Sequence, residues 1–263
     1  MRVKKDDSID KITKKAWENN WENISISEIM EIFEYPRVKQ HLDIYLKYLP
    51  KDKKIIEGGC GLGPYLIKLK ELGYDVVGVD YNKEPLDKIR EYDPDIPLFC
   101  SDIQVLPFSN EYFGGYLSLG VIEHFTEGPE RSIKEARRVL GKGGYFIVKV
   151  PQSSIFEKIS YPFILLKKNK IIRRMFGKNP KEIYWEQHFK VRELSGMIKK
   201  NGFDIVEMIP IDHEHALMSF CGVFRDKNKY DGANEAGVAV SKICQRYLPW
   251  LTAAEVIYVC RKK

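Results

Sequence analysis

A run of glycines between residues 57 and 63 constrains this chain more than any other feature. Residues 55–63 have the sequence IIEGGCGLG, which ends an apolar, strand-like segment and precedes a helical pattern at 65–72. Glycine allows the backbone to approach a ligand closely, where a side chain would block it. The stretch therefore predicts a strand, a ligand-binding loop and a helix in succession.

The spacing of these glycines excludes one common ligand class. A dinucleotide-binding fingerprint requires G-x-G-x-x-G. A start at Gly59 would place the last glycine at Pro64, and a start at Gly58 would place the second at Cys60. The pattern that fits is E-x-G-x-G-x-G, formed by Glu57, Gly59, Gly61 and Gly63.

Composition limits the other possibilities. With 263 residues, 44% of them hydrophobic, the chain can bury one large core or a core with a cap. A net charge of +6 suits an anionic substrate or a membrane surface and is too small for a dedicated nucleic-acid binder. The N-terminus has no apolar signal segment and the apolar runs are too short to span a bilayer, so we expect a cytoplasmic protein.

The cysteines predict neither disulfides nor a metal site. There are five, with no C-x-x-C pair. Cys60, Cys100 and Cys260 lie in or beside apolar, strand-like runs, so we expect buried free thiols.

Strand-like and helix-like segments alternate through the middle of the chain. Expected strands at 54–57, 75–80, 98–100, 116–119 and 145–150 alternate with expected helices at 65–72, 83–92 and 129–140. This alternation indicates a parallel sheet covered on both faces. Two late strands, 203–209 and 256–260, follow a helix at 191–201 and could pair in antiparallel fashion. We expect an N-terminal helical cap (1–50) and one α/β domain (51–263) that contains an inserted lid (152–190).

Three further motifs follow the glycine loop in order: Leu106-Pro107-Phe108, Glu123-His124, and R-V-L-G-K-G-G over residues 138–144. Together with the loop they resemble the class I S-adenosylmethionine-dependent methyltransferases, and in motif pattern the ubiquinone and menaquinone biosynthesis type. The resemblance implies a Rossmann-like three-layer sandwich whose mostly parallel sheet ends in an antiparallel hairpin. It also implies S-adenosylmethionine as cofactor and methyl transfer by in-line displacement.

Acidic residues after the second and third strands are the next candidates for the site. Asp80 ends the second strand, where a carboxylate can accept hydrogen bonds from both ribose hydroxyls; a helix cap or a solvated strand end is the alternative. The resemblance implies that Asp102 accepts from the adenine amino group and that the Ile103 N–H meets the ring; an ordinary Asx turn would also explain Asp102. The predicted cofactor contacts are Glu57, Gly59, Gly61, Gly63, Asp80, Tyr81, Asp102, Ile103 and Leu119, with Leu119 near the methionine end.

A general base is useful only if the acceptor is a poorly acidic hydroxyl. His124, after the fourth strand, is the best-placed candidate, and a structural hydrogen bond to the backbone explains it equally well. His188 resembles a family position that starts a helix. His213 and His215 would lie on one face of an extended segment and could bind a metal, but a solvated loop is favoured because no third ligand is apparent.

Residues 155–178 combine an apolar, aromatic segment with a basic one. They could be the solvated positive face of a substrate lid, or a peripheral contact with a membrane or an anionic lipid. Trp17, Trp21 and Trp185 could line the acceptor pocket or simply pack in the core.

The predicted function is methyl transfer from S-adenosylmethionine to a small molecule, which could be lipid-linked or anionic. The alternatives are an RNA or protein methyltransferase and a non-catalytic S-adenosylmethionine-binding module. The asparagine-proline-proline-tyrosine motif of amino-group methyltransferases is absent after the fourth strand, which disfavours exocyclic base amines. Other RNA or protein targets stay open, but the modest net charge makes nucleic acid an unexpected partner.

Overall fold

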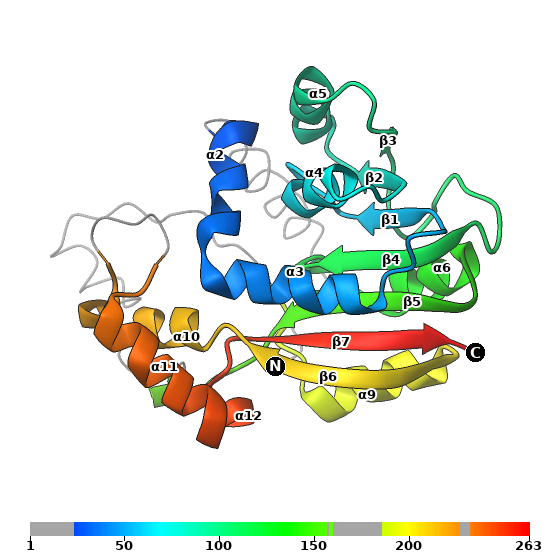
Figure 1. Cartoon of the computed structure of the whole chain (residues 1–263). Coiled ribbons are helices and arrows are strands. Elements are labelled where there is room, and N and C mark those ends of the chain that lie inside the picture. The colour runs from blue at the N-terminus through cyan, green and yellow to red at the C-terminus, as the bar shows by residue number, and fades with distance from the viewer. Residues whose placement is uncertain (1–23, 157, 160–185, 227–231) are drawn as a thin grey trace, which may run out of the picture. The chain divides into compact units, whose positions relative to one another are not determined.

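The computed structural model describes residues 24–156, 158–159, 186–226 and 232–263 (Figure 1). The three tryptophans at 17, 21 and 185 and most of the basic insert lie outside these ranges. Contacts divide the chain into two compact units. The first contains residues 1–150, 184–208 and 257–263, and the second contains 151–183 and 209–256. The boundaries of these units differ from those of the predicted cap, domain and lid, and that division stays a prediction.

A seven-stranded sheet forms the centre of the fold, in the order β3-β2-β1-β4-β5-β7-β6 (Figure 1). Its strands are β1 (Ile55–Gly58), β2 (Val76–Asp80), β3 (Leu98–Cys100), β4 (Phe113–Leu119), β5 (Leu140–Pro151), β6 (Phe203–Ile211) and β7 (Glu255–Lys262). Strands β1 to β5 pair in parallel. The late strands form the antiparallel hairpin. The predicted Rossmann-like sandwich is therefore confirmed.

Helices on both sides cover this sheet, as expected for a mostly parallel sheet. Those of the first unit are α2 (Ile26–Met30), a 3-10 turn η1 (Glu31–Glu34), α3 (Pro36–Tyr48), α4 (Pro64–Glu71), α5 (Lys83–Tyr92), η2 (Ile122–His124), α6 (Glu130–Val139) and α9 (Val191–Lys200). Local sequence sets their ends. Gly73 adopts a φ of +82° just after Leu72, the C-cap of α4, and the Asn82 side chain accepts from the Glu84 N–H at the start of α5. Covered on both faces, β1 and β2 are buried along their whole length.

The start of β5 differs from the prediction. The glycines at 141–144 suggested a turn before a strand at 145, but the strand begins at Leu140. Leu140 pairs with Phe113, and the register shifts before Tyr145 pairs with Gly115. The glycines thus form an irregularity within the strand, since glycine accommodates a bulge that other residues resist.

The second unit contains helices where the sequence offered no periodic signal. They are α10 (His213–Phe220), the 3-10 turn η3 (Gly222–Phe224), α11 (Glu235–Tyr247) and α12 (Pro249–Thr252). The solvated loop expected around His213 is therefore wrong, because His213 begins α10 and its Nδ1 lies 2.9 Å from Thr252 Oγ1. Burial lowers the pKa of His213, which favours the neutral ring.

All five cysteines are free thiols, but not all of them are buried. Cys60 and Cys260 are buried, whereas Cys100 is exposed because it lies on β3, the edge strand of the sheet. Within the described segments, no helix combines the length and apolar character that crossing a membrane requires.

Arg138 connects two of the sequence motifs. Its guanidinium donates to the carbonyls of Phe108 (2.7 Å) and Leu106 (3.0 Å) and to both carboxylate oxygens of Glu135 (2.9 and 2.7 Å). Glu135 also accepts from the Leu106 N–H at 2.6 Å, and the hydrogen bonds from Arg138 lower its pKa. The arginine of the R-V-L motif thus fixes the L-P-F loop against α6, because a planar guanidinium can bind several oxygens at once.

Replacing Arg138 by methionine should lower the free energy of unfolding by about 2–4 kcal/mol, because it removes charged hydrogen bonds and leaves carbonyls without donors. Urea denaturation measures the change. The matched variant Lys134→Met, at an exposed position of the same helix, should change stability by no more than about 0.5 kcal/mol. Equal losses in the two variants would contradict this role of Arg138.

Candidate functional site

The loop after β1 explains why the glycines are spaced as they are. Gly59, Gly61 and Gly63 adopt φ values of +75°, +53° and +62°, a left-handed conformation that glycine adopts without strain. A Cβ added at Gly59 would lie 2.6 Å from a methyl of Val121. The N–H groups of Gly59 and Cys60 both donate to the Val79 carbonyl, at 2.7 and 3.0 Å. Every second residue of the loop must therefore be glycine for β1 to turn into α4.

Asp80 holds this loop against the end of β2. Its Oδ2 accepts from the Gly61 N–H and its Oδ1 from the Asn82 N–H, both at 2.8 Å. Burial raises the pKa of Asp80, and the backbone hydrogen bonds partly offset that effect. A carboxylate has about four acceptor positions, so these hydrogen bonds leave it capacity to accept from a further donor.

The register of the strands places four side chains on one face of the sheet. Glu57 pairs with Gly78 on β2 and with Leu117 on β4, and Leu117 pairs with Ile147 on β5. Side chains two residues apart on a strand share a face. Asp80, Glu57, Leu119 and Lys149 therefore project from the same face, at or near the carboxyl ends of β2, β1, β4 and β5.

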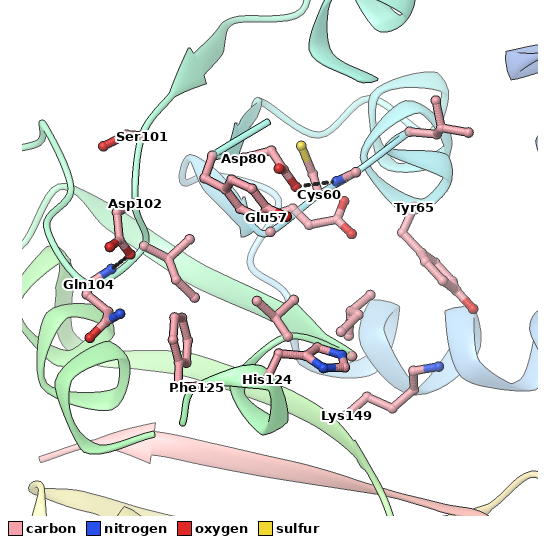
Figure 2. Close-up of a pocket in the computed structure, with 18 of the residues that line it drawn as sticks. Glu57, Cys60, Tyr65, Asp80, Ser101, Asp102, Gln104, His124, Phe125 and Lys149 are labelled. Atoms are coloured by element: carbon pink, nitrogen blue, oxygen red, sulfur yellow. Dashed lines mark hydrogen bonds between the residues drawn. The ribbon is translucent and has the colours of Figure 1, made fainter. Parts of the chain in front are cut away.

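These side chains surround a cavity of about 510 Å³ (Figure 2). It is lined by nearly all the predicted site residues: Glu57, Gly59, Gly61, Asp80, Tyr81, Asp102, Ile103, Leu119 and His124. Gly63 does not line it, and instead directly precedes α4. Carboxyl ends of parallel strands are where open α/β sheets bind ligands. The structure therefore brings the predicted residues together, and their individual contacts with a cofactor stay predictions.

Asp102 forms the Asx turn that was one of its two predicted roles. Its Oδ1 accepts from the Gln104 N–H at 2.9 Å. The turn places the exposed carboxylate and the buried Ile103 side chain on the cavity wall. The turn and the adenine contact are therefore compatible, because one carboxylate can accept several hydrogen bonds.

Glu57 is a buried carboxyl group within the cavity wall. Burial raises its pKa to about 8, and no described residue forms a hydrogen bond with its Oε2. An acid in such a place is protonated at neutral pH until a positive charge approaches it. A ligand with an ammonium or sulfonium group would supply that charge.

His124 and Lys149 line the cavity (Figure 2), and Lys149 pairs with Leu119 on the neighbouring strand β4. His124 is half-buried on the turn η2, with its Nε2 3.9 Å from Glu123 Oε1. His124 therefore lines the cavity, and its two predicted roles, a general base and a structural hydrogen bond, both stay predictions. His188 lies apart from the cavity lining, with its Nε2 2.7 Å from Glu186 Oε1.

Sequence reasoning missed several lining residues, which include Tyr65, Val121, Phe125, Arg131 and Lys149. One signal was present for Lys149, which is the only charged residue in the apolar segment YFIVKV at 145–150. A lysine that ends a buried strand at this edge of a sheet is a site candidate. The described part of the chain brings together no group of three His, Cys, Asp or Glu side chains that could hold a metal ion.

Comparison with known proteins agrees with this geometry. Residues 56–148 match the family model described as a methyltransferase domain. The whole chain resembles the solved structure of an S-adenosylmethionine-dependent methyltransferase from Thermotoga maritima, titled a possible histamine N-methyltransferase. The TM-score is 0.60 at 20% identity, over 97% of this chain and 100% of the other. Residues 56–148 thus match a methyltransferase domain, within a fold similar to that of S-adenosylmethionine-dependent methyltransferases. S-adenosylmethionine is the cofactor of this class.

Two curated relatives match the same part of the chain. The human protein named probable tRNA methyltransferase 9B is 35% identical over 118 residues, which cover 44% of this chain and 24% of that protein. The Xenopus tropicalis tRNA (carboxymethyluridine(34)-5-O)-methyltransferase alkbh8 is 33% identical over 108 residues, or 40% of this chain and 17% of that protein. The chain thus spans only about a quarter or less of the length of these relatives.

The residues of the cavity fit this cofactor. Asp80 retains acceptor capacity for the ribose hydroxyls, and the glycine loop presents backbone without side chains at its positions of closest approach. The buried Glu57 would face a positive charge that offsets its own burial. When bound, S-adenosylmethionine supplies an activated methyl group, so the protein needs mainly to align the acceptor and exclude water.

The raised pKa of Glu57 predicts a pH-dependent stability. Between its ordinary value of 4.5 and about 8, the folded chain keeps a proton on Glu57 that the unfolded chain loses. The free energy of unfolding of the wild type should therefore fall relative to Glu57→Gln as the pH rises from 4.5 to about 8, and the difference should level off above that. Urea titrations at steps across this range measure it.

A matched substitution serves as the control for Glu57. Glu91→Gln, at an exposed position of α5, should follow the wild-type pH profile. Parallel profiles for the wild type and Glu57→Gln would show that Glu57 does not bind a proton on folding.

Proposed function

We propose that the whole protein is a methyltransferase that transfers the methyl group of S-adenosylmethionine to an anionic or lipid-linked small molecule. The observation that carries this proposal is the position of Lys149. It projects from the same face of the sheet as Asp80 and Glu57, but from β5, on the far side of β1 and β4 from Asp80.

This arrangement separates Lys149 from the acidic residues at the ends of β2 and β3. Asp80 ends β2 and Asp102 follows β3, where the nucleoside is predicted to lie, whereas Lys149 pairs with Leu119 on β4. Figure 2 shows Asp102 and Lys149 at opposite sides of the view. A lysine close to the positive sulfonium centre would oppose cofactor binding, so Lys149 favours an anionic group near it, either the carboxylate of the cofactor or a group on the acceptor. An anionic group on the acceptor would pair with the lysine and bring a nucleophile close to the methyl group.

His124 has a conditional role in this proposal. An acceptor that is already an oxyanion needs no base, whereas a neutral hydroxyl does. His124 lines the cavity at the end of β4 and is the group that could take such a proton.

A tRNA acceptor is the second candidate, and the curated relatives favour it. Both relatives described above are named tRNA methyltransferases, and both align with the domain that holds the cavity. The modest net charge of +6 and the small-molecule size of the cavity favour the first candidate.

A labelled-methyl screen separates these candidates. Cell extract is divided into bulk RNA, anionic metabolites retained on an anion-exchange resin, and the flow-through, and each fraction is incubated with the protein and labelled S-adenosylmethionine. We expect label in the anionic metabolites. Label in the RNA, with salt-dependent tRNA binding, would support the tRNA acceptor instead, and the absence of label from every fraction would contradict catalysis.

The variant Lys149→Met tests the acceptor site directly. It should lower label incorporation by about 10–100-fold, the loss expected for one charged hydrogen bond, while binding of S-adenosylhomocysteine stays unchanged. The exposed Lys142 on the same strand offers a control, Lys142→Met, which should behave as wild type. Full activity in Lys149→Met would contradict the role of this lysine.

A further inference from the structure

Helices α11 and α12, with the residue between them, expose several large apolar side chains in the second unit. Its exposed fractions are 59% for Ile243, 68% for Tyr247, 51% for Leu248, 44% for Trp250 and 42% for Leu251. Single exposed apolar side chains are common on soluble proteins, but a cluster of five neighbours in the sequence is not. We call this cluster the α11–α12 surface.

Helix α11 buries small side chains and exposes large apolar ones, which is the reverse of an ordinary amphipathic helix. Its buried positions are the small residues Gly237 and Ser241. A Cβ at Gly237 would lie 2.7 Å from the Phe224 carbonyl, so α11 packs tightly through this small face. Its large apolar residues Ile243 and Tyr247, four positions apart, share the outer face. The helix is therefore fixed to its own unit and presents its large apolar side chains outward.

The chain extends the same surface beyond α11. Leu248 follows the last residue of α11 and Pro249 begins α12. Trp250 and Leu251, on α12, are exposed as well. The surface thus ends in a tryptophan, a side chain with a large apolar body and a polar N–H.

The charge beside these apolar side chains is positive. Lys242 and Arg246 lie on the half of α11 that carries Ile243 and Tyr247, whereas Glu235, the one acidic residue of α11 and α12, lies at the other end of α11. Both cations are exposed and lie four positions apart on α11. Arg246 lies 5.5 Å from the centroid of the Tyr247 ring, so the basic and apolar groups adjoin.

We propose that the α11–α12 surface docks on an anionic lipid membrane. Tyr and Trp prefer the depth of the lipid headgroups, aliphatic side chains enter the acyl boundary, and Lys and Arg bind anionic headgroups. A second copy of this chain suits the surface less well, since a symmetric dimer through these apolar side chains would bring the four cations of the two copies close together. This surface is distinct from the predicted lipid contact at 155–178, which lies mostly outside the described residues.

Vesicle co-sedimentation of the full chain tests this inference. We expect binding to phosphatidylcholine vesicles that contain phosphatidylglycerol, and little binding to phosphatidylcholine alone. The double variant Lys242→Glu/Arg246→Glu should weaken the partition coefficient by about thirtyfold or more, because each basic residue near an anionic surface contributes roughly a factor of five. The control Lys199→Glu/Lys200→Glu makes the same change in net charge on exposed positions of α9 and should bind nearly as the wild type does.

A second double variant tests how much the apolar side chains contribute to membrane binding. Ile243→Ser/Tyr247→Ser should reduce binding at least about tenfold, because both side chains would leave the acyl boundary. The control Val105→Ser, at a 73% exposed position of the first unit, should have no effect.

Three results would overturn the inference. They are absence of vesicle binding, equal loss in the charge-matched control, and a dimer in light scattering that Tyr247→Arg dissociates. None of them bears on methyl transfer to a soluble acceptor.

Discussion

The hydrogen bonds that Asp80 makes with the backbone determine the shape of the site. One carboxylate at the end of β2 accepts from Gly61 in the loop after β1 and from Asn82 at the start of α5. These bonds connect two loops that are about twenty residues apart in sequence, at the edge of the sheet where strands end. Because the carboxylate is buried, releasing either N–H would leave a charge with too few donors. The glycine loop therefore has one conformation available, with left-handed residues at every second position.

The parallel register then distributes charge across the face of the sheet. Glu57 and Asp80 on β1 and β2 are acidic, and Lys149 on β5 is basic, with Leu119 on β4 between them. This order follows from strand pairing and the two-residue period of side chains. A cationic group such as the sulfonium of S-adenosylmethionine is thus favoured on one side of the cavity and an anionic group on the other. That separation is the physical basis for proposing an anionic acceptor.

Sequence alone predicted the parts of the fold that depend on local chemistry. The spacing of the glycines, the helix stop at Gly73 and the acid at Asp80 each correspond to a local conformation, so the loop, α4 and the ends of β1 and β2 could be predicted. Exposure of Cys100 depends instead on strand order, since β3 is at the edge of the sheet. The helix at His213 is set by tertiary packing against Thr252, which no local pattern records. The position of Lys149 in the site needed the register between β4 and β5.

If Asp80 both holds the loop and binds the cofactor ribose, its replacement should weaken the binding of S-adenosylhomocysteine, which titration calorimetry measures. The wild type should bind. Asp80→Ala should bind about 10–100-fold more weakly, the loss expected for charged hydrogen bonds. Asp80→Asn, which keeps one carbonyl acceptor, should fall between the two, and Asp95→Ala at an exposed position should match the wild type. Unchanged affinity in Asp80→Ala, or no binding by the wild type, would contradict the account.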